Sequence, residues 1–129
     1  MEAALALEKV NLAQKFSLFR EQYQPRIVGE LNDSYVKVVK LQGDFMWHHH
    51  DVEDELFLVI AGELRMKVRE HGAEREFLVQ PGEFIIIPRG VEHFPSAEVE
   101  TQVVLLEPKS TLNTGNVENE RTVAQLQRI

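Results

Sequence analysis

The pattern of hydrophobic and polar positions changes at Pro25 and again at Pro108, and between these two prolines it is typical of short strands. Apolar residues at 64, 66 and 68 alternate with basic residues at 65, 67 and 69, which indicates a strand with one buried face. Turn pairs such as His71-Gly72 and Pro81-Gly82 separate segments of this kind. Further strands are predicted at residues 36–41, 56–60, 76–79, 84–87 and 101–106. About eight short strands, with turn signals every 8–12 residues or so, predict an all-β sandwich or barrel.

The segment before Pro25 has a helical pattern instead. Apolar residues recur along one stripe, at Leu5, Leu12, Phe16, Phe19 and Tyr23. We therefore predict a helix over residues 3–23 that packs on the barrel or on a second subunit. The residues after Pro108 are polar and rich in turn formers, with a final helical turn expected at 123–129. The predicted organisation is an N-terminal helix at 1–24, a barrel domain at 25–108 and a polar tail at 109–129.

Composition narrows the classes of partner and of site. The 129 residues suit one domain, and 21 acidic against 14 basic side chains give a formal net charge of −7. Nucleic acids and anionic membranes both attract basic proteins, so we expect neither as a partner. The absence of cysteine excludes a disulfide framework, a zinc ribbon and a thiol nucleophile. The longest apolar run, at 56–61, is far shorter than a membrane span, and no basic leader precedes it, so a cytoplasmic location is expected.

Histidines gather in two short segments that carry the candidate chemistry. His48 and His50 are two residues apart, and on a strand this spacing places both side chains on one face. Glu55 follows at the start of the next predicted strand, and His93 comes after the turn at residues 88–90. In a closed barrel the two segments can face each other, which makes a set of three imidazoles and one carboxylate. Nitrogen and oxygen donors without sulfur suit Fe(II), Mn, Ni, Co, Cu or Zn.

These two segments resemble the two signature motifs of the cupin superfamily. In the first, His48-x-His50 is followed by four residues, Glu55, six residues and Gly62. In the second, Gly82 is followed by five residues, Pro88-x-Gly90, two residues and His93. The sequence departs from the family pattern twice, because only four residues separate Gly43 from His48 and because Ala97 stands where the family has Asn. Neither of those two positions is a metal ligand in the family.

The resemblance implies a fold, a cofactor and a class of function. The expected fold is a double-stranded β-helix, the small jelly-roll barrel of cupins, with an N-terminal α-helix. The expected cofactor is one divalent transition metal per chain (Fe, Mn, Ni, Zn, Co or Cu), held by His48, His50, Glu55 and His93. The expected function is a small metal-dependent enzyme, of the dioxygenase or the sugar and small-molecule isomerase type, whose substrate chelates the metal. The alternative is a non-catalytic module that binds or senses a small molecule, and a homodimer is expected in both cases.

Other residues near the two motifs have open roles at this stage. Met46, Phe57 and Val59 either line the substrate pocket or fill the barrel core. Arg89 flanks the expected mouth of the pocket, as does Glu92, and either orients an anionic substrate or forms a surface salt bridge. No catalytic residue apart from the metal set can be identified.

Three further features have an alternative interpretation. Asp54 is the fallback for Glu55, since a shorter family spacing would select it. His49 is expected to be structural or to support the ligands, and His71 to lie at the surface. The basic residues at 65, 67 and 69 form either the solvated face of a strand or a docking site for an anionic group.

Overall fold

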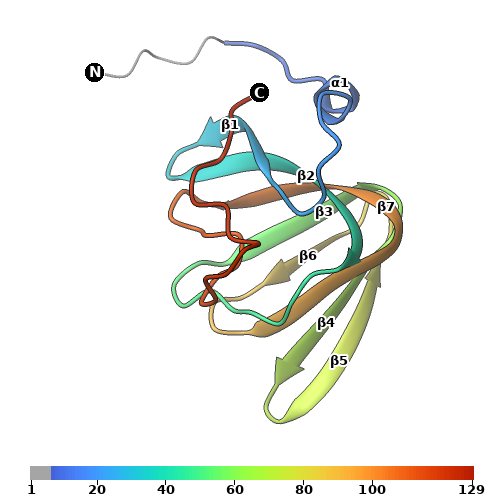
Figure 1. The fold of residues 1–129 in the computed structure, drawn as a ribbon, viewed down its shortest axis with the longest axis vertical. Coiled ribbons are helices and arrows are strands. Elements are labelled where there is room, and N and C mark those ends of the chain that lie inside the picture. The colour runs from blue at the N-terminus through green and yellow to red at the C-terminus, as the bar shows by residue number, and fades with distance from the viewer. Residues whose placement is uncertain (1–6) are drawn as a thin grey trace.

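The computed structural model describes residues 7–129, which fold into a small barrel of antiparallel strands with one short helix (Figure 1). The helix is α1 (Leu12–Phe16). The strands are β1 (Arg26–Leu31), β2 (Ser34–Asp44), β3 (Glu55–Ala61), β4 (Leu64–Glu70), β5 (Ala73–Val79), β6 (Phe84–Ile87) and β7 (Glu92–Pro108). The prediction of an all-β jelly-roll barrel is therefore confirmed.

Strand β7 joins the two layers of the barrel. Its C-terminal half pairs with β2 and β3 in a sheet of order β1-β2-β7-β3-β6, and its N-terminal half pairs with β4, which in turn pairs with β5. One strand of 17 residues thus replaces the separate strands that the sequence suggested after residue 90. The two layers face each other in Figure 1, and the apolar side chains between them form the main core.

The turn from β3 to β4 depends on a glycine. Gly62 has a φ of 88°, and a Cβ atom built on it would lie 2.8 Å from the Cα of Thr101. Thr101 is fully buried, and its hydroxyl accepts a hydrogen bond from the backbone N–H of Glu63 at 3.0 Å. The family glycine at this position therefore lets two backbones approach closely, as well as allowing the left-handed conformation.

The predicted N-terminal helix is much shorter than expected. Among residues 7–24 only Leu12–Phe16 is helical, so the predicted helix is wrong over residues 7–11 and 17–23. Residues 3–6 of that prediction lie outside the described part of the chain. Phe16 and Phe19 pack on the outer face of the sheet, whereas Tyr23 belongs to the core between the layers. A single helix cannot place one stripe on two sides of a sheet. The chain leaves the helix instead, with a φ of 59° at Tyr23.

The C-terminal residues also differ from the prediction. No helical turn forms at 123–129; the end of the chain runs beside β1, where Ile129 N–H donates to the carbonyl of Ile27 at 3.1 Å. Before that, residues 111–122 cross the end of the barrel beside the connection between β2 and β3 (Figure 1). We call residues 111–122 the strap. In the described part of the chain no helix is long and apolar enough to span a membrane.

Candidate metal centre

Two of the four predicted ligands lie on a loop rather than on a strand. Residues 45–54, which we call the ligand loop, connect β2 to β3 and carry His48 and His50. The loop is extended and meets β7 in one isolated bridge, where His48 and His93 exchange backbone hydrogen bonds of 2.9 and 3.1 Å. The strand that the His-x-His argument assumed is therefore absent. The two side chains still turn to the same side, because the bridge holds the loop against β7.

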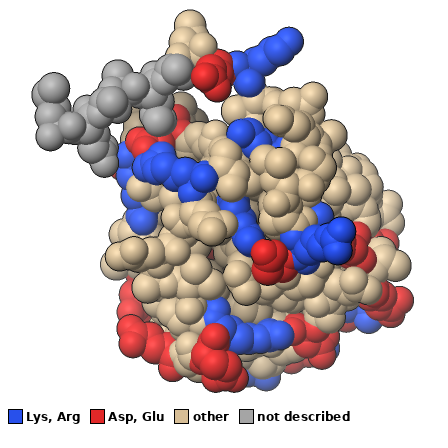
Figure 2. Space-filling model, turned by 45° about the horizontal axis from the view of Figure 1, so that its top comes forward, with Lys and Arg blue, Asp and Glu red and all other residues tan. Residues whose placement is uncertain are grey.

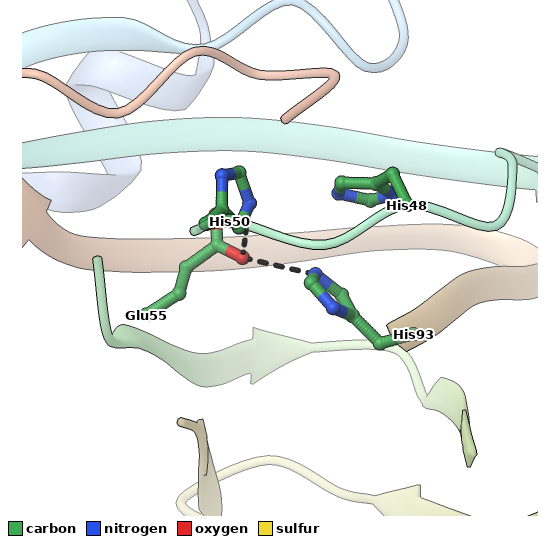
Figure 3. Close-up of side chains that lie close together, drawn as sticks. All are labelled: His48, His50, Glu55 and His93. Atoms are coloured by element: carbon green, nitrogen blue, oxygen red, sulfur yellow. Dashed lines mark hydrogen bonds and ion pairs between the residues drawn. The ribbon is translucent and has the colours of Figure 1, made fainter. Parts of the chain in front are cut away.

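The four predicted residues come together inside the barrel. Each offers a ligand atom, and these atoms all lie within 4.8 Å of one another. The Oε1 atom of Glu55 lies 3.2 Å from Nε2 of His50 and 3.2 Å from Nε2 of His93. Figure 3 shows this oxygen between the two imidazoles, with His48 beside them. All four side chains are buried, and His93 is completely so.

Backbone carbonyls orient two of the imidazoles. Nδ1 of His48 lies 3.0 Å from the carbonyl oxygen of Met46, and Nδ1 of His93 lies 2.9 Å from that of Val91. A carbonyl only accepts, so each Nδ1 carries the proton and each Nε2 keeps a free lone pair. A hydrogen bond of this kind fixes the tautomer that a metal-binding histidine needs.

His50 provides the test of whether a metal fits this site. Both of its ring nitrogens are buried without a hydrogen-bond partner, although Nε2 is close to Glu55. A buried polar atom without a partner costs about 1–3 kcal/mol, and folded proteins rarely tolerate it. A cation bound among the four side chains would give this imidazole a partner. The donor set and its geometry therefore fit one metal ion.

The ionisation of the cluster also suits a cation. Burial, together with the neighbouring His93, lowers the pKa of His48 to about 4, so that its imidazole is neutral at neutral pH. Burial on its own raises the pKa of Glu55, but the neighbouring side chains of Glu107, His50 and His93 outweigh it and hold that pKa well below the usual range. For His50 the balance is opposite, since Glu55 outweighs burial and raises its pKa. A bound metal ion would displace the proton that this raised pKa favours on the imidazole of His50.

A buried ion pair supports the cluster, and sequence reasoning missed it. Nζ of Lys37 lies 2.9 Å from Oε1 of Glu107, and both side chains are only 2% exposed. The second oxygen of Glu107, Oε2, is buried without a hydrogen-bond partner. Burial and the negative charge of Glu55 raise the pKa of Glu107 well above its ordinary value, although Lys37 acts in the opposite direction. Lys37 lies in the strand predicted at residues 36–41, where nothing in the pattern indicates a buried charge.

A small cavity adjoins the cluster. Its volume is about 40 Å³, and His48, Glu55 and Glu107 contribute to its wall. The other lining residues are mainly apolar and come from the barrel interior and the strap: Tyr23, Pro25, Val39, Leu41, Phe45, Phe57, Pro95, Leu105 and Asn113. The site thus has room for about one small molecule of the size of water.

The structure brings only one of the predicted pocket residues to this cavity. Phe57 lines it and contacts the ring of His93, with 6.2 Å between the ring centres. Val59 is fully buried and is not among the residues that line the cavity. It therefore fills the barrel core rather than lining the pocket. The side chain of Met46 contacts the strap, with Sδ 3.6 Å from Nδ2 of Asn119.

Arg89 also lies away from the cluster. Its guanidinium forms a surface salt bridge with Asp54, with contacts of 3.2 and 3.3 Å, and the structure does not place it beside the cavity. Asp54, the fallback ligand, is engaged there, and Glu55 takes the place in the cluster. His49 turns outward and lies 2.9 Å from Asp51, while His71 is exposed in its turn with a φ of 51°.

Of the two interpretations of the basic residues of β4, the structure favours the solvated face of a strand over a docking site for an anionic group. Nε of Arg65 lies 2.9 Å from Glu76, and Nε of Arg69 lies 3.8 Å from Glu74, across the β4–β5 pair. These contacts are exposed and use the charges that a docking site for an anion would need.

Comparisons with known proteins agree with this geometry. The family model of the cupin domain matches residues 35–108. The crystal structure of a cupin-2 domain-containing protein from Shewanella frigidimarina is 40% identical, with a TM-score of 0.73, and the match covers 78% of this chain and 94% of that one.

Two curated proteins are also similar in sequence. The uncharacterized protein YdbB of Bacillus subtilis is 29% identical over 99 residues, which are 77% of this chain and 85% of that protein. The acireductone dioxygenase of Bacillus subtilis is 26% identical over 86 residues, which are 66% of this chain and only 48% of the enzyme.

Proposed function

The chain belongs to the cupin family, and from this membership we propose that it is a small metal-dependent enzyme of the dioxygenase type, acting on a small molecule that chelates the metal. The observation that carries the proposal is the buried cluster of three imidazoles and one carboxylate, with its unpartnered His50. Similarity to acireductone dioxygenase supports oxygen chemistry over isomerisation, although the match spans about half of that enzyme.

The metal and the protein would have separate tasks. A bound Fe, Mn, Ni, Zn, Co or Cu ion supplies a Lewis acid with open coordination positions for a chelating substrate. His48, His50, Glu55 and His93 would hold it, and the backbone carbonyls behind His48 and His93 fix the direction of their lone pairs. Phe57 and its apolar neighbours keep bulk water from the site. Among the described residues that line the cavity, the side chains outside the metal set that can exchange a proton are Tyr23 and Glu107.

The test compares metal-loaded protein under oxygen and under nitrogen. Protein loaded separately with Fe(II), Mn(II), Ni(II) or Zn(II) is incubated with a metabolite extract, and products are followed by mass spectrometry beside an oxygen electrode. We expect the wild type to consume a metabolite only when oxygen is present. The variant His93→Ala should not consume it. Turnover that is equal under nitrogen would replace the dioxygenase with an isomerase. Binding of a metabolite without turnover under either gas would favour a non-catalytic binding or sensing module.

We propose a homodimer that forms through the outer face of the β1-β2-β7-β3-β6 sheet. Two rows of apolar side chains cross this face, Val36-Leu106-Leu56-Ile86 and Val38-Val104-Leu58-Phe84. The α1 segment covers the Val38 and Val104 end, but Phe84 and Ile86 are 60% and 50% exposed. Apolar Leu7 and Val10, in the chain before α1, are exposed as well, so a second copy supplies both missing surfaces.

Light scattering tests this contact. We expect the mass of a dimer for the wild type and of a monomer for the double variant Phe84→Lys, Ile86→Lys. The control Leu78→Lys changes an equally exposed leucine on β5, outside both rows, and should leave the dimer intact. A monomeric wild type, or a dimer that persists in the double variant, would show that the contact is elsewhere or absent.

A small-molecule ligand remains the expected partner. On the face shown in Figure 2, lysines and arginines are scattered among acidic side chains, without one continuous basic field. Such a surface, with a formal net charge of −7, gives no electrostatic basis for binding nucleic acid or an anionic membrane. The cytoplasmic location stays a prediction, which cell fractionation would test.

A further inference from the structure

The strap lies outside the residues that match the cupin domain, yet it contacts the metal centre. The match ends at residue 108, and the strap begins at residue 111. Its contacts cover the end of β2 and the first half of the ligand loop. They join Asn113 to the cavity wall, Gly115 to His48 and His49, Asn116 to His49, Asn119 to Met46, and Arg121 to the carbonyl of Asp44.

Asn116 and His49 form a reciprocal pair of hydrogen bonds. The backbone N–H of Asn116 donates to the carbonyl of His49 at 3.0 Å, and the backbone N–H of His49 donates to Oδ1 of Asn116 at 2.9 Å. His49 lies between the two histidines that point into the cluster. The pair therefore fixes the peptide units that set where His48 and His50 point.

Gly115 brings the strap into direct contact with the loop. A Cβ atom on this residue would overlap the carbonyl oxygen of His49 and lie 3.1 Å from Cδ2 of His48. Gly115 also has a φ of 58°, which favours glycine. Only a residue without a side chain allows this approach, so the strap presses on the backbone that carries the ligands.

The stretch of the ligand loop that carries the two histidines has few other restraints. On its inner side it is held by the bridge between His48 and His93 and by a hydrogen bond from Gly90 N–H to the carbonyl of His50, 2.7 Å long. On its outer side the strap provides the hydrogen bonds. The ends of the loop are held separately, at Phe45 by Pro95, at Glu53 by Ser110 and at Asp54 by Arg89. Internal bonds keep the strap in shape, including Thr114 Oγ1 to Thr122 Oγ1 at 2.7 Å and Val123 N–H to Oδ1 of Asn113 at 2.8 Å.

We propose that the strap is part of the metal centre, with Asn116 and Gly115 as positioning residues that hold His48 and His50 in ligating geometry and slow the release of the metal. This inference rests on the proposed function, because it assumes that the four residues bind a metal. The strap acts on two of the four ligands only. Its loss should therefore loosen the bound metal rather than abolish binding.

The experiment measures the release of Co(II) to a chelator from the full chain, together with the cobalt absorption spectrum. Asn116 is exposed, so Asn116→Ala should fold, and it removes the acceptor of the His49 N–H. We expect release to become about 10-fold faster or more, in the range found when groups behind metal ligands are lost, with an altered spectrum. Asn116→Asp keeps an acceptor oxygen and should restore the wild-type rate.

Glu30→Gln is the matched control for general loosening of the C-terminal region. It removes the ion pairs of Glu30 with Lys109 and Arg128, which lie on either side of the strap in the sequence. Its release rate should stay within about 2-fold of the wild type. Cobalt that binds the wild type but leaves Asn116→Ala no faster than Glu30→Gln would overturn the role of the strap alone. A wild type that binds no cobalt would overturn the proposed function and this inference with it.

Discussion

His50→Ala should lose its metal, whereas His49→Ala should keep it. The two histidines are neighbours on the same loop, but the imidazole of His50 lies within the cluster and that of His49 contacts Asp51 near the surface. Removing one of four donors should lower the affinity for Zn(II) or Co(II) by more than about 100-fold, beyond the cost of losing a group behind a ligand. Competition with a chromophoric chelator measures both affinities on the same scale.

The comparison separates ligation from a general effect on the loop. Circular dichroism should show that both variants fold. Metal affinities that stay at the wild-type value in both His49→Ala and His50→Ala would refute the assignment of His50. A loss in both would instead mean that the ligand loop itself had been disturbed.

Lys37→Met should destabilise the metal-free protein by about 3 kcal/mol, because it leaves the carboxyl of Glu107 buried beside Glu55 without its cation. Lys109→Met, which breaks an exposed pair with Glu30, should change stability little. Urea unfolding measures both. A double variant Lys37→Met, Glu107→Leu removes both charges and should recover most of the loss.

The raised pKa of Glu107 predicts how the stability lost in Lys37→Met changes with pH. In the folded protein the pKa of Glu107 is raised above its unfolded value, so the proton on Glu107 contributes stability that is fully present below the unfolded pKa. That stability is lost as the pH rises through the folded pKa. Removal of Lys37 raises the folded pKa further, so the variant should be more strongly destabilised at pH 8 than at pH 5.5. An equal loss at the two pH values would mean that Lys37 does not control the titration of Glu107 in this range.

The sequence predicts the ligand set better than it predicts the structure around it. The spacing of the two motifs selects Glu55 over Asp54, and the structure brings Glu55 to the three histidines while Asp54 pairs with Arg89. The reason given for His48 and His50, strand alternation, does not hold, because the loop between β2 and β3 carries them. The spacing of the family motif identifies the two ligands, but it does not show that a backbone bridge from His48 to His93 holds them in place.

The features that could not be predicted all depend on contacts between distant residues. Lys37 and Glu107 are 70 positions apart, and neither sequence segment suggests a buried charge. The strap looked like a polar tail, since Gly115 and Asn116 gain their meaning only from the backbone of His49, 67 positions before Asn116. The apolar stripe before Pro25 predicted too long a helix for a related reason, because Phe16 and Tyr23 pack against different faces of the sheet.

Metal content tests the central claim most directly. The protein is expressed in medium supplied with Fe, Mn, Ni, Co, Cu and Zn and is purified without chelators. Elemental mass spectrometry then gives the molar ratio of each metal to the protein. We predict close to one transition metal ion per folded chain, bound by His48, His50, Glu55 and His93. Folded protein that contains no transition metal, and takes up none when Fe(II), Co(II) or Zn(II) is added, would contradict it.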